Sequence, residues 1–375
     1  MEFRDLKAQY RALQPAMDRA ILETVASGGY IGGARVKALE ERLAAYVGVK
    51  HCITCGNGTD ALQLMLTAWG IGPGDAVFVP DFTFFASGEA VSFVGGTPVF
   101  FDVDQETFNG SAESLEQAIQ AVLEEGKLTP KAVIAVDLYG LPADYPAIEA
   151  VARRYGLKVL EDAAQGFGGK IGNRRACSFG DGACTSFFPA KPLGCYGDGG
   201  AVFTNDDETA ALVRSLCVHG KGSDKYDNVR IGMNSRLDAV QAAVLDVKLD
   251  AFESRELEAV NQAAKWYDRA LSGLRTPVVP EGFFSSWAQY TLRLDSREQR
   301  DSVQAALKER GIPTMVYYPK PMQEQTAFGE VRAYVDRPNT RKLCETVLSL
   351  PMHPYLEEET VRQVAEALKE CLETK

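Results

Sequence analysis

The chain has 375 residues, of which 46% are hydrophobic and 24% charged, which is ordinary for a globular protein with a large core. Its formal net charge of −11 disfavours partners held by bulk positive charge, so neither a nucleic acid nor a membrane surface is expected. No apolar run is long enough to span a bilayer, and the polar start, Met1 to Asp5, has no signal-peptide pattern; we expect a cytoplasmic protein. The eight cysteines are predicted to be reduced core thiols, and Cys52-Ile53-Thr54-Cys55 lacks the second pair of a zinc set, so no metal is predicted.

Helical and strand patterns alternate through the first two thirds of the chain. Helical periodicity covers residues 5–27 and 34–46 and returns between the later strands. Such alternation predicts βαβ units and a mostly parallel sheet. The predicted strands are 51–55, 76–80, 97–103, 131–136, 158–162, 183–188 and 201–204, and the later helices are 111–124, 146–155 and 208–217.

The loop from Gly56 to Asp60 joins the first predicted strand to a helix. Asn57, Thr59 and Asp60 are all suitable helix caps. The free N–H groups at such a helix start form a ready phosphate site, although a plain capped helix is an equally good interpretation. The lysine of a P-loop is missing.

The predicted strand 158–162 ends in two carboxylates, Glu161 and Asp162. Charges at the carboxyl end of a parallel strand lie where α/β sheets bind ligands. Phe84 follows an earlier strand end, where an aromatic ring could stack on a flat heterocycle, although core packing is the commoner use of phenylalanine.

Lys191 stands between Pro189 and Pro192, in the connection between two predicted strands, and several glycines follow it. The prolines fix the backbone, and a stiff, dry mounting suits a lysine that forms a Schiff base. A solvated lysine in a surface turn is the ordinary alternative. Asp162 lies 29 residues earlier, which leaves room for both to reach one pocket. A buried aspartate facing such a lysine is what a pyridoxal phosphate (PLP) site requires, because the carboxylate keeps the pyridine nitrogen protonated.

The remainder of the chain predicts a second, smaller α/β domain. Asn234 and Arg236 cluster donors that suit phosphate or carboxylate, although an Arg–Asp surface pair is the commoner outcome. A long helix is predicted over 239–264, so we divide the chain into a large domain, 1–245, and a small domain, 246–375. A strand over 287–294, a helix over 297–309 and loops at 316–319 and 350–355 are predicted in the small domain.

Taken together, four motifs resemble the DegT/DnrJ/StrS sugar aminotransferases in their order and spacing. The resemblance implies the α/β fold-type I of PLP-dependent transferases, with a mostly parallel mixed sheet in the large domain. Within the family the chain is most similar to the WbpE/WlbC type, which aminates UDP-2-acetamido-3-keto-glucuronic acid, through the runs 183–189, 192–197 and 350–355. The four motifs are Gly-Asn-Gly-Thr-Asp-Ala-Leu at 56–62, Glu-Asp-Ala-Ala-Gln at 161–165, Ser-Phe-Phe-Pro-x-Lys-x-Leu-Gly with Gly-Asp-Gly-Gly at 186–200, and Asn-Ser-Arg-Leu-Asp at 234–238.

The resemblance also implies a role for each matching residue. Lys191 would bond the cofactor and carry protons, Asp162 would pair with the pyridine nitrogen, and Gln165 would lie near the phenolic oxygen. Phe84 would stack on the ring. The phosphate would be held by Gly58, Thr59, Ser186 and a neighbouring chain's Asn234, and the sugar would be bound by that chain's Arg236 and by Tyr317 and Tyr318.

The implied reaction is amino transfer from L-glutamate to a keto sugar nucleotide in two covalent halves, which predicts ping-pong kinetics. The expected acceptor is a UDP-linked 2-acetamido-3-keto sugar, a uronate, in bacterial surface-polysaccharide biosynthesis. Shared residues imply a homodimer. One departure is visible: the subgroup tends to have His-Tyr-Pro where this chain has Tyr317-Tyr318-Pro319, and a tyrosine carries no positive charge at neutral pH.

Other interpretations compete with this one. The acceptor could be a 4-keto or dTDP-linked sugar. A fold-type I lyase acting on a sulfur amino acid is disfavoured because the sugar-family motifs are complete. A dehydratase branch that replaces the lysine by histidine is disfavoured by Lys191. A non-catalytic sensor of a sugar nucleotide or of PLP is the fourth alternative.

Overall fold

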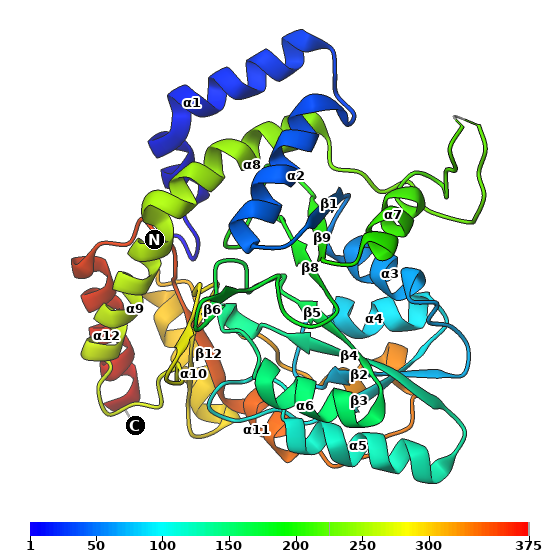
Figure 1. Ribbon diagram of the computed structural model, residues 1–375. Coiled ribbons are helices and arrows are strands. Elements are labelled where there is room, and N and C mark those ends of the chain that lie inside the picture. The colour runs from blue at the N-terminus through cyan, green and yellow to red at the C-terminus, as the bar shows by residue number, and fades with distance from the viewer. Residues whose placement is uncertain (225, 374–375) are drawn as a thin grey trace.

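The protein is described by a computed structural model that covers residues 1–224 and 226–373 (Figure 1). A seven-stranded sheet in the order β1-β9-β8-β5-β4-β2-β3 forms its centre. β9 is antiparallel to both of its neighbours, whereas β3, β2, β4, β5 and β8 pair in parallel, which confirms the predicted α/β fold with a mostly parallel mixed sheet. The strands are β1 (His51–Cys55), β2 (Asp75–Pro80), β3 (Thr97–Phe101), β4 (Thr129–Val136), β5 (Lys158–Asp162), β8 (Gly182–Ser186) and β9 (Gly200–Thr204).

Helices cover both faces of this sheet because successive strand residues point to opposite sides. On one side Ile134 packs in a core with α3 (Gly58–Ala68), α4 (Phe85–Phe93) and α7 (Asp207–Leu216). On the other side Ala135 packs in a core with two helices. They are α5 (Ala112–Glu125) and α6 (Tyr145–Tyr155). Further along that side, α2 (Gly33–Val47) and α1 (Leu6–Ser27) pack against α8 (Ala239–Ala251).

A long helix leads into the C-terminal part of the chain. α8, a π-helical segment (Phe252–Glu256) and α9 (Leu257–Ala270) follow one another without a break, so the helix runs past its predicted end at 264. α9 then packs in a separate core with a two-stranded antiparallel sheet. The predicted division at residue 245 falls inside α8 and stays a prediction. The elements of this region are β11 (Tyr290–Arg293), β12 (Val347–Leu350), α10 (Arg297–Glu309), α11 (Pro338–Thr346) and α12 (Glu358–Glu373).

Several predicted boundaries are wrong. The strand predicted over 287–294 begins at Tyr290, because Trp287 has a φ of 49°, which is incompatible with an extended chain. The loop predicted at 350–355 starts one residue too early, since Leu350 still pairs with Tyr290. The strands predicted to reach 103 and 188 end at Phe101 and Ser186. The two-residue strands β6 (Lys170–Ile171), β7 (Arg174–Arg175) and β10 (Phe283–Phe284) are too short to show a sequence period.

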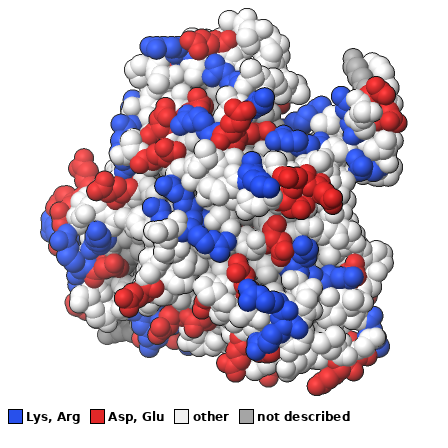
Figure 2. Space-filling view, in the orientation of Figure 1, with Lys and Arg blue, Asp and Glu red and all other residues white. Residues whose placement is uncertain are grey.

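The distribution of charged side chains and of cysteines can be followed on the structure. Acidic and basic side chains are interspersed on the face shown in Figure 2. All eight cysteines are free, and seven of them are buried. Within residues 1–224 and 226–373, no helix has the length and apolarity needed to cross a membrane.

Candidate active site

A cavity of about 660 Å³ opens at the carboxyl ends of β4, β5 and β8, where ligands bind in α/β sheets. Val136, Asp162 and Ser186, the last residues of these three strands, line it. Nine of the predicted site residues meet in this cavity, although Asn234 and Arg236 do not line it. The nine are Gly58, Thr59, Phe84, Asp162, Gln165, Ser186, Lys191, Tyr317 and Tyr318.

Lys191 lies on the turn that follows β8, and its backbone N–H donates to the carbonyl of Phe188 at 2.8 Å. Burial lowers the pKa of the Lys191 ammonium to about 8, although the carboxylate of Asp162 favours the charged form; the guanidinium of Arg4 lowers the pKa further. A lysine with this pKa is partly unprotonated near neutral pH, as a nucleophile must be. The site therefore offers a reactive amine.

Asp162 is 5% exposed, and two donors hold its carboxylate. The hydroxyl of Ser87 donates to Oδ2 at 2.7 Å, and the N–H of Ala164 donates to Oδ1 at 3.2 Å. Burial raises the pKa of Asp162, and these hydrogen bonds and the charge of Lys191 oppose that rise. A buried, fixed carboxylate beside a cationic lysine suits a ligand that carries a proton on a ring nitrogen.

The start of α3 and the end of β8 lie together and present hydrogen-bond donors to the cavity. The Asn57 side chain caps the helix by accepting from the N–H of Asp60 at 2.8 Å. Gly58 allows the close approach, because a Cβ there would lie 2.7 Å from the Cβ of Ser186. The first-turn N–H groups of a helix have no intrahelical partners, so the hydroxyl of Ser186 lies beside donors suited to a phosphate.

Gln165 links the sheet edge to the lining residues from the C-terminal part of the chain. These are Gln289, Tyr317 and Tyr318, and we call them the opposite wall. Its Oε1 accepts from the N–H of Tyr139 at 2.8 Å, and its Nε2 donates to the hydroxyl of Tyr318 at 3.1 Å. The hydroxyl of Tyr139 donates to the carbonyl of Tyr317. Phe84 is 54% exposed, and its ring centroid lies 6.2 Å from that of Tyr318, so a face of Phe84 is open to a flat ligand.

Sequence reasoning missed Arg4, whose Nη2 donates to the carbonyl of Lys191 at 2.8 Å. The ring of Phe3 contacts Tyr317 with centroids 6.2 Å apart, and the N–H of Met352 donates to the carbonyl of Phe3 at 3.1 Å. The N-terminal segment therefore lies against the lysine turn. No local pattern could have shown this, because 187 positions separate the two residues. The other cavity residues without a predicted role include Asp60, Asp198 and Gln289.

Asn234 and Arg236 lie together but face solvent. Arg236 Nη2 donates to Asn234 Oδ1, and both side chains are exposed. Ser235, between them, is buried and connects to the α3 loop: its hydroxyl donates to Asp60 at 2.6 Å and accepts from the N–H of Gly56 at 2.9 Å. Their predicted roles across a subunit interface stay predictions.

These residues fit pyridoxal phosphate. The helix start and Ser186 suit its phosphate, Asp162 suits its ring nitrogen, and Lys191 suits its aldehyde. The fit depends on donors for a phosphate, an acceptor for a ring N–H and an amine, and one cavity contains all three.

Comparison with known proteins gives the family. The profile of the DegT/DnrJ/EryC1/StrS aminotransferase family matches residues 12–369. A UDP-2-acetamido-2-deoxy-3-oxo-D-glucuronate aminotransferase from Pseudomonas aeruginosa is 46% identical over 98% of this chain and 99% of its own length. A UDP-N-acetyl-3-dehydro-alpha-D-glucosamine 3-aminotransferase from Acidithiobacillus ferrooxidans is 41% identical over 98% of this chain and 97% of its own.

Solved structures agree with this assignment. The crystal structure of a DegT/DnrJ/EryC1/StrS aminotransferase from Brucella abortus is 49% identical and covers 100% of both chains, with a TM-score of 0.97. More distant neighbours include PLP and pyridoxamine phosphate forms of one Streptococcus pneumoniae protein, both with TM-scores of 0.87. The chain therefore belongs to the DegT/DnrJ/EryC1/StrS aminotransferase family and is a PLP-dependent sugar aminotransferase of fold-type I.

Proposed function

We propose that this protein transfers the amino group of L-glutamate to the 3-keto group of a UDP-linked 2-acetamido sugar, a uronate in the first instance, in surface-polysaccharide biosynthesis. The observation that carries the proposal is that Lys191, Asp162 and the start of α3 line one cavity. The names of the relatives at 46% and 41% identity supply the substrate class, since both describe UDP-linked 3-oxo sugars.

Pyridoxal phosphate, when bound, draws electrons from the carbon that carries the amino group and makes its proton acidic. Lys191 Nζ would be the base that takes this proton and passes it to the cofactor's C4′ carbon, because a pKa of about 8 lies close to neutral pH. Asp162 holds a proton on the ring nitrogen, and Ser87 orients Asp162 for that purpose. Lys191 therefore serves proton transfer, and Asp162 serves charge stabilisation.

The other cavity residues bind and orient the reactants. Gly58, Thr59 and Ser186 would donate to the phosphate of the cofactor, and Phe84 would cover its ring. Gln165 would lie near the phenolic oxygen, and it holds Tyr318 through their hydrogen bond. Tyr317 and Tyr318 present neutral donors and acceptors to the sugar.

A homodimer with shared active sites is part of the proposal. Asn234 and Arg236 are exposed and do not line the cavity of their own chain, and their amide and guanidinium groups suit an anion. The chain just before them extends away from the molecule between α7 and α8 (Figure 1) and exposes Val229 and Ile231 at 53% and 93%. Exposed apolar side chains next to anion donors suit a contact with a second copy. In that dimer Asn234 completes the neighbour's phosphate site, and Arg236 faces its sugar.

The test is an assay of UDP-linked and dTDP-linked 3-keto and 4-keto sugars with L-glutamate, with the products identified by mass. We expect the UDP-linked 3-keto uronate to be aminated fastest. A preference for a 4-keto or dTDP-linked sugar would contradict the proposal. Tyr317, which is uncharged at neutral pH, favours a second candidate in the same panel, the UDP-linked 3-keto sugar without a carboxylate.

A further inference from the structure

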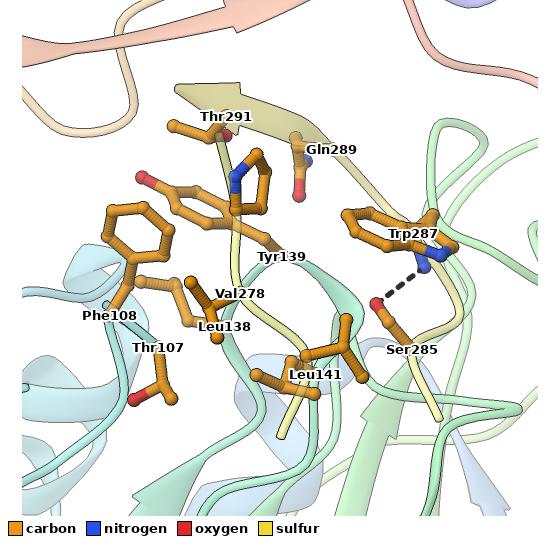
Figure 3. A pocket seen from close by; sticks show the side chains of 12 residues that line it. Thr107, Phe108, Leu138, Tyr139, Leu141, Val278, Ser285, Trp287, Gln289 and Thr291 are labelled. Carbon is orange, nitrogen blue, oxygen red and sulfur yellow. Dashed lines mark hydrogen bonds between the residues drawn. The ribbon is translucent and has the colours of Figure 1, made fainter. Parts of the chain in front are cut away.

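Gln289 lines the active-site cavity and also a second, much smaller pocket, which Figure 3 shows. The small pocket has a volume of about 20 Å³, and Tyr139 and Trp287 are among the residues around it. This volume accommodates one water molecule and no larger ligand.

The carboxamide of Gln289 has unused hydrogen-bonding capacity. Its Oε1 is buried and accepts no hydrogen bond from the described residues. In Figure 3 the side chain extends from the start of β11 towards the small pocket, where a water molecule can satisfy this oxygen. Its Nε2 is not fully buried, and it makes no hydrogen bond in the described part of the chain. Two N–H groups are therefore available to a ligand in the larger cavity.

The backbone around Gln289 is held in an unusual conformation. Tyr139 and Trp287 have φ values of 59° and 49°, in the left-handed region that residues other than glycine rarely adopt. Their segments are joined by hydrogen bonds from the N–H of Gln289 to the carbonyl of Tyr139 at 3.3 Å and from the N–H of Ser286 to the carbonyl of Gly140 at 2.8 Å. Strained backbone persists where its surroundings hold it, and it gathers at ligand sites.

This framework also fixes Gln289 relative to the cofactor side of the cavity. The N–H of Tyr139 donates to Gln165 Oε1, and the hydroxyl of Ser286 donates to the carbonyl of Gln165 at 3.1 Å. The backbone that carries Gln289 is thus tied to the segment that follows Asp162. A side chain on a fixed backbone loses less freedom when it binds a ligand.

We propose that Gln289 is a specificity-determining residue that donates from Nε2 to a hydroxyl or acetamido oxygen of the keto sugar, which rests on the proposed function. The cofactor-binding residues come from the ends of β5 and β8 and from α3, whereas Gln289 comes from the opposite wall with Tyr317 and Tyr318. That wall is neutral. Neutral amides and phenols match sugar oxygens, whereas the carboxylates of glutamate need cations.

The test is Gln289→Leu, which keeps the size of the side chain and removes its hydrogen bonds. We expect KM for the keto sugar nucleotide to rise roughly tenfold, the effect of one lost hydrogen bond, with kcat changed less than about twofold. The half-reaction with glutamate, followed through the absorbance of the bound cofactor, keeps its rate. Calorimetric binding of UDP-N-acetylglucosamine, used as a probe, weakens by a similar factor.

Gln323→Leu is the matched control, because its Oε1 is also buried without a partner while its Nε2 donates to the carbonyl of Val331 at 2.7 Å, outside the cavity. It should leave the sugar KM unchanged. If Gln289→Leu does not fold, Gln289→Glu, which keeps the shape and loses the donor, replaces it. An unchanged sugar KM, or an equal loss in the glutamate half-reaction, overturns the inference. The variants are compared on the keto sugar nucleotide that the wild type aminates fastest. The role of Gln289 can therefore be tested even if the wild type does not prefer a 3-keto sugar.

Discussion

The two walls of the active-site cavity are built in different ways. The sheet-side wall carries charged or anion-binding groups, Lys191, Asp162 and the start of α3, on short segments that follow β-strands. The opposite wall carries neutral groups, Gln289, Tyr317 and Tyr318. Charged groups on a rigid sheet edge serve a chemistry common to the whole family, whereas neutral groups on another structural layer are free to differ with the substrate.

The effects of variants on the two half-reactions can test this difference between the walls. Changes on the sheet-side wall should slow both half-reactions, because the cofactor takes part in both. Changes on the opposite wall should slow one half-reaction and spare the other. Variants of the sheet-side wall, and of the N-terminal segment that carries Arg4, are expected to differ in the size of their effects, and they are taken here from the largest to the smallest.

Asp162→Ala should bind the cofactor and lose amino transfer by about a hundred- to a thousandfold, because nothing then stabilises the charge on the ring. Stopped-flow absorbance with glutamate and with the keto sugar gives both rates. Equal losses in the two half-reactions are expected. Near-normal turnover would mean that Asp162 does not face the ring nitrogen.

Mixed dimers test the proposed sharing of sites. Lys191→Ala and Asn234→Ala protomers are each expected to be inactive or severely impaired, and mixing them should restore about a quarter of wild-type activity. That fraction follows because half of randomly paired dimers are mixed, and each then has one intact site. Mixing after mild dissociation, followed by a steady-state assay, measures it. Absence of any rescue would place Asn234 outside the neighbour's site.

Ser87→Ala removes the hydrogen bond of 2.7 Å that orients Asp162. We expect about a tenfold loss in both half-reactions, since hydrogen bonds to charged groups are among the stronger ones. Ser114→Ala is the matched control, because Ser114 is also buried but its hydroxyl accepts from the N–H of Asp102 at 2.9 Å. Wild-type rates in Ser87→Ala would show that Asp162 needs no such support.

Arg4→Met should have the smallest effect and should change pH dependence more than rate. Because the guanidinium of Arg4 lowers the pKa of Lys191, its loss raises that pKa from about 8. The apoprotein then needs a higher pH to present a neutral amine, so the midpoint of its pH profile for PLP uptake moves upward. Arg11→Met, an exposed arginine on α1, is the control. A midpoint that does not change or that moves to lower pH would show that Arg4 does not lower the pKa of Lys191.

The sheet-side wall is also the part that the sequence predicts well. The bounds of β1 and β5 match their predictions, because buried strands bounded by turn residues have a clear pattern. Gly58, Ser186 and Lys191 each lie within one short motif. The distances between their segments were not predictable. The parallel pairing of β5 and β8 brings Asp162 beside Ser186 and the lysine turn, and β9 lies between β8 and β1, which leads to Gly58.

Gln289 and Arg4 depend on contacts that no local pattern encodes, whereas the family resemblance already predicts Tyr317 and Tyr318. Gln289 is placed by the positive φ angles of Tyr139 and Trp287, and aromatic residues give no sign of that conformation in sequence. Arg4 reaches Lys191 because α1 packs on α8 and carries the N-terminal segment beside the lysine turn. Tertiary packing therefore decides the part of the site that the sequence leaves open.

The most direct test of the central claim is the visible absorbance of the protein reconstituted with pyridoxal phosphate, for the wild type and Lys191→Ala. The account predicts a wild-type band of the lysine-bound cofactor that fades on addition of L-glutamate and returns with the keto sugar nucleotide. Lys191→Ala should lack this band. A wild type without the band, or a Lys191→Ala protein with the same band and the same responses, would contradict the assignment of Lys191 as the cofactor-bonding amine.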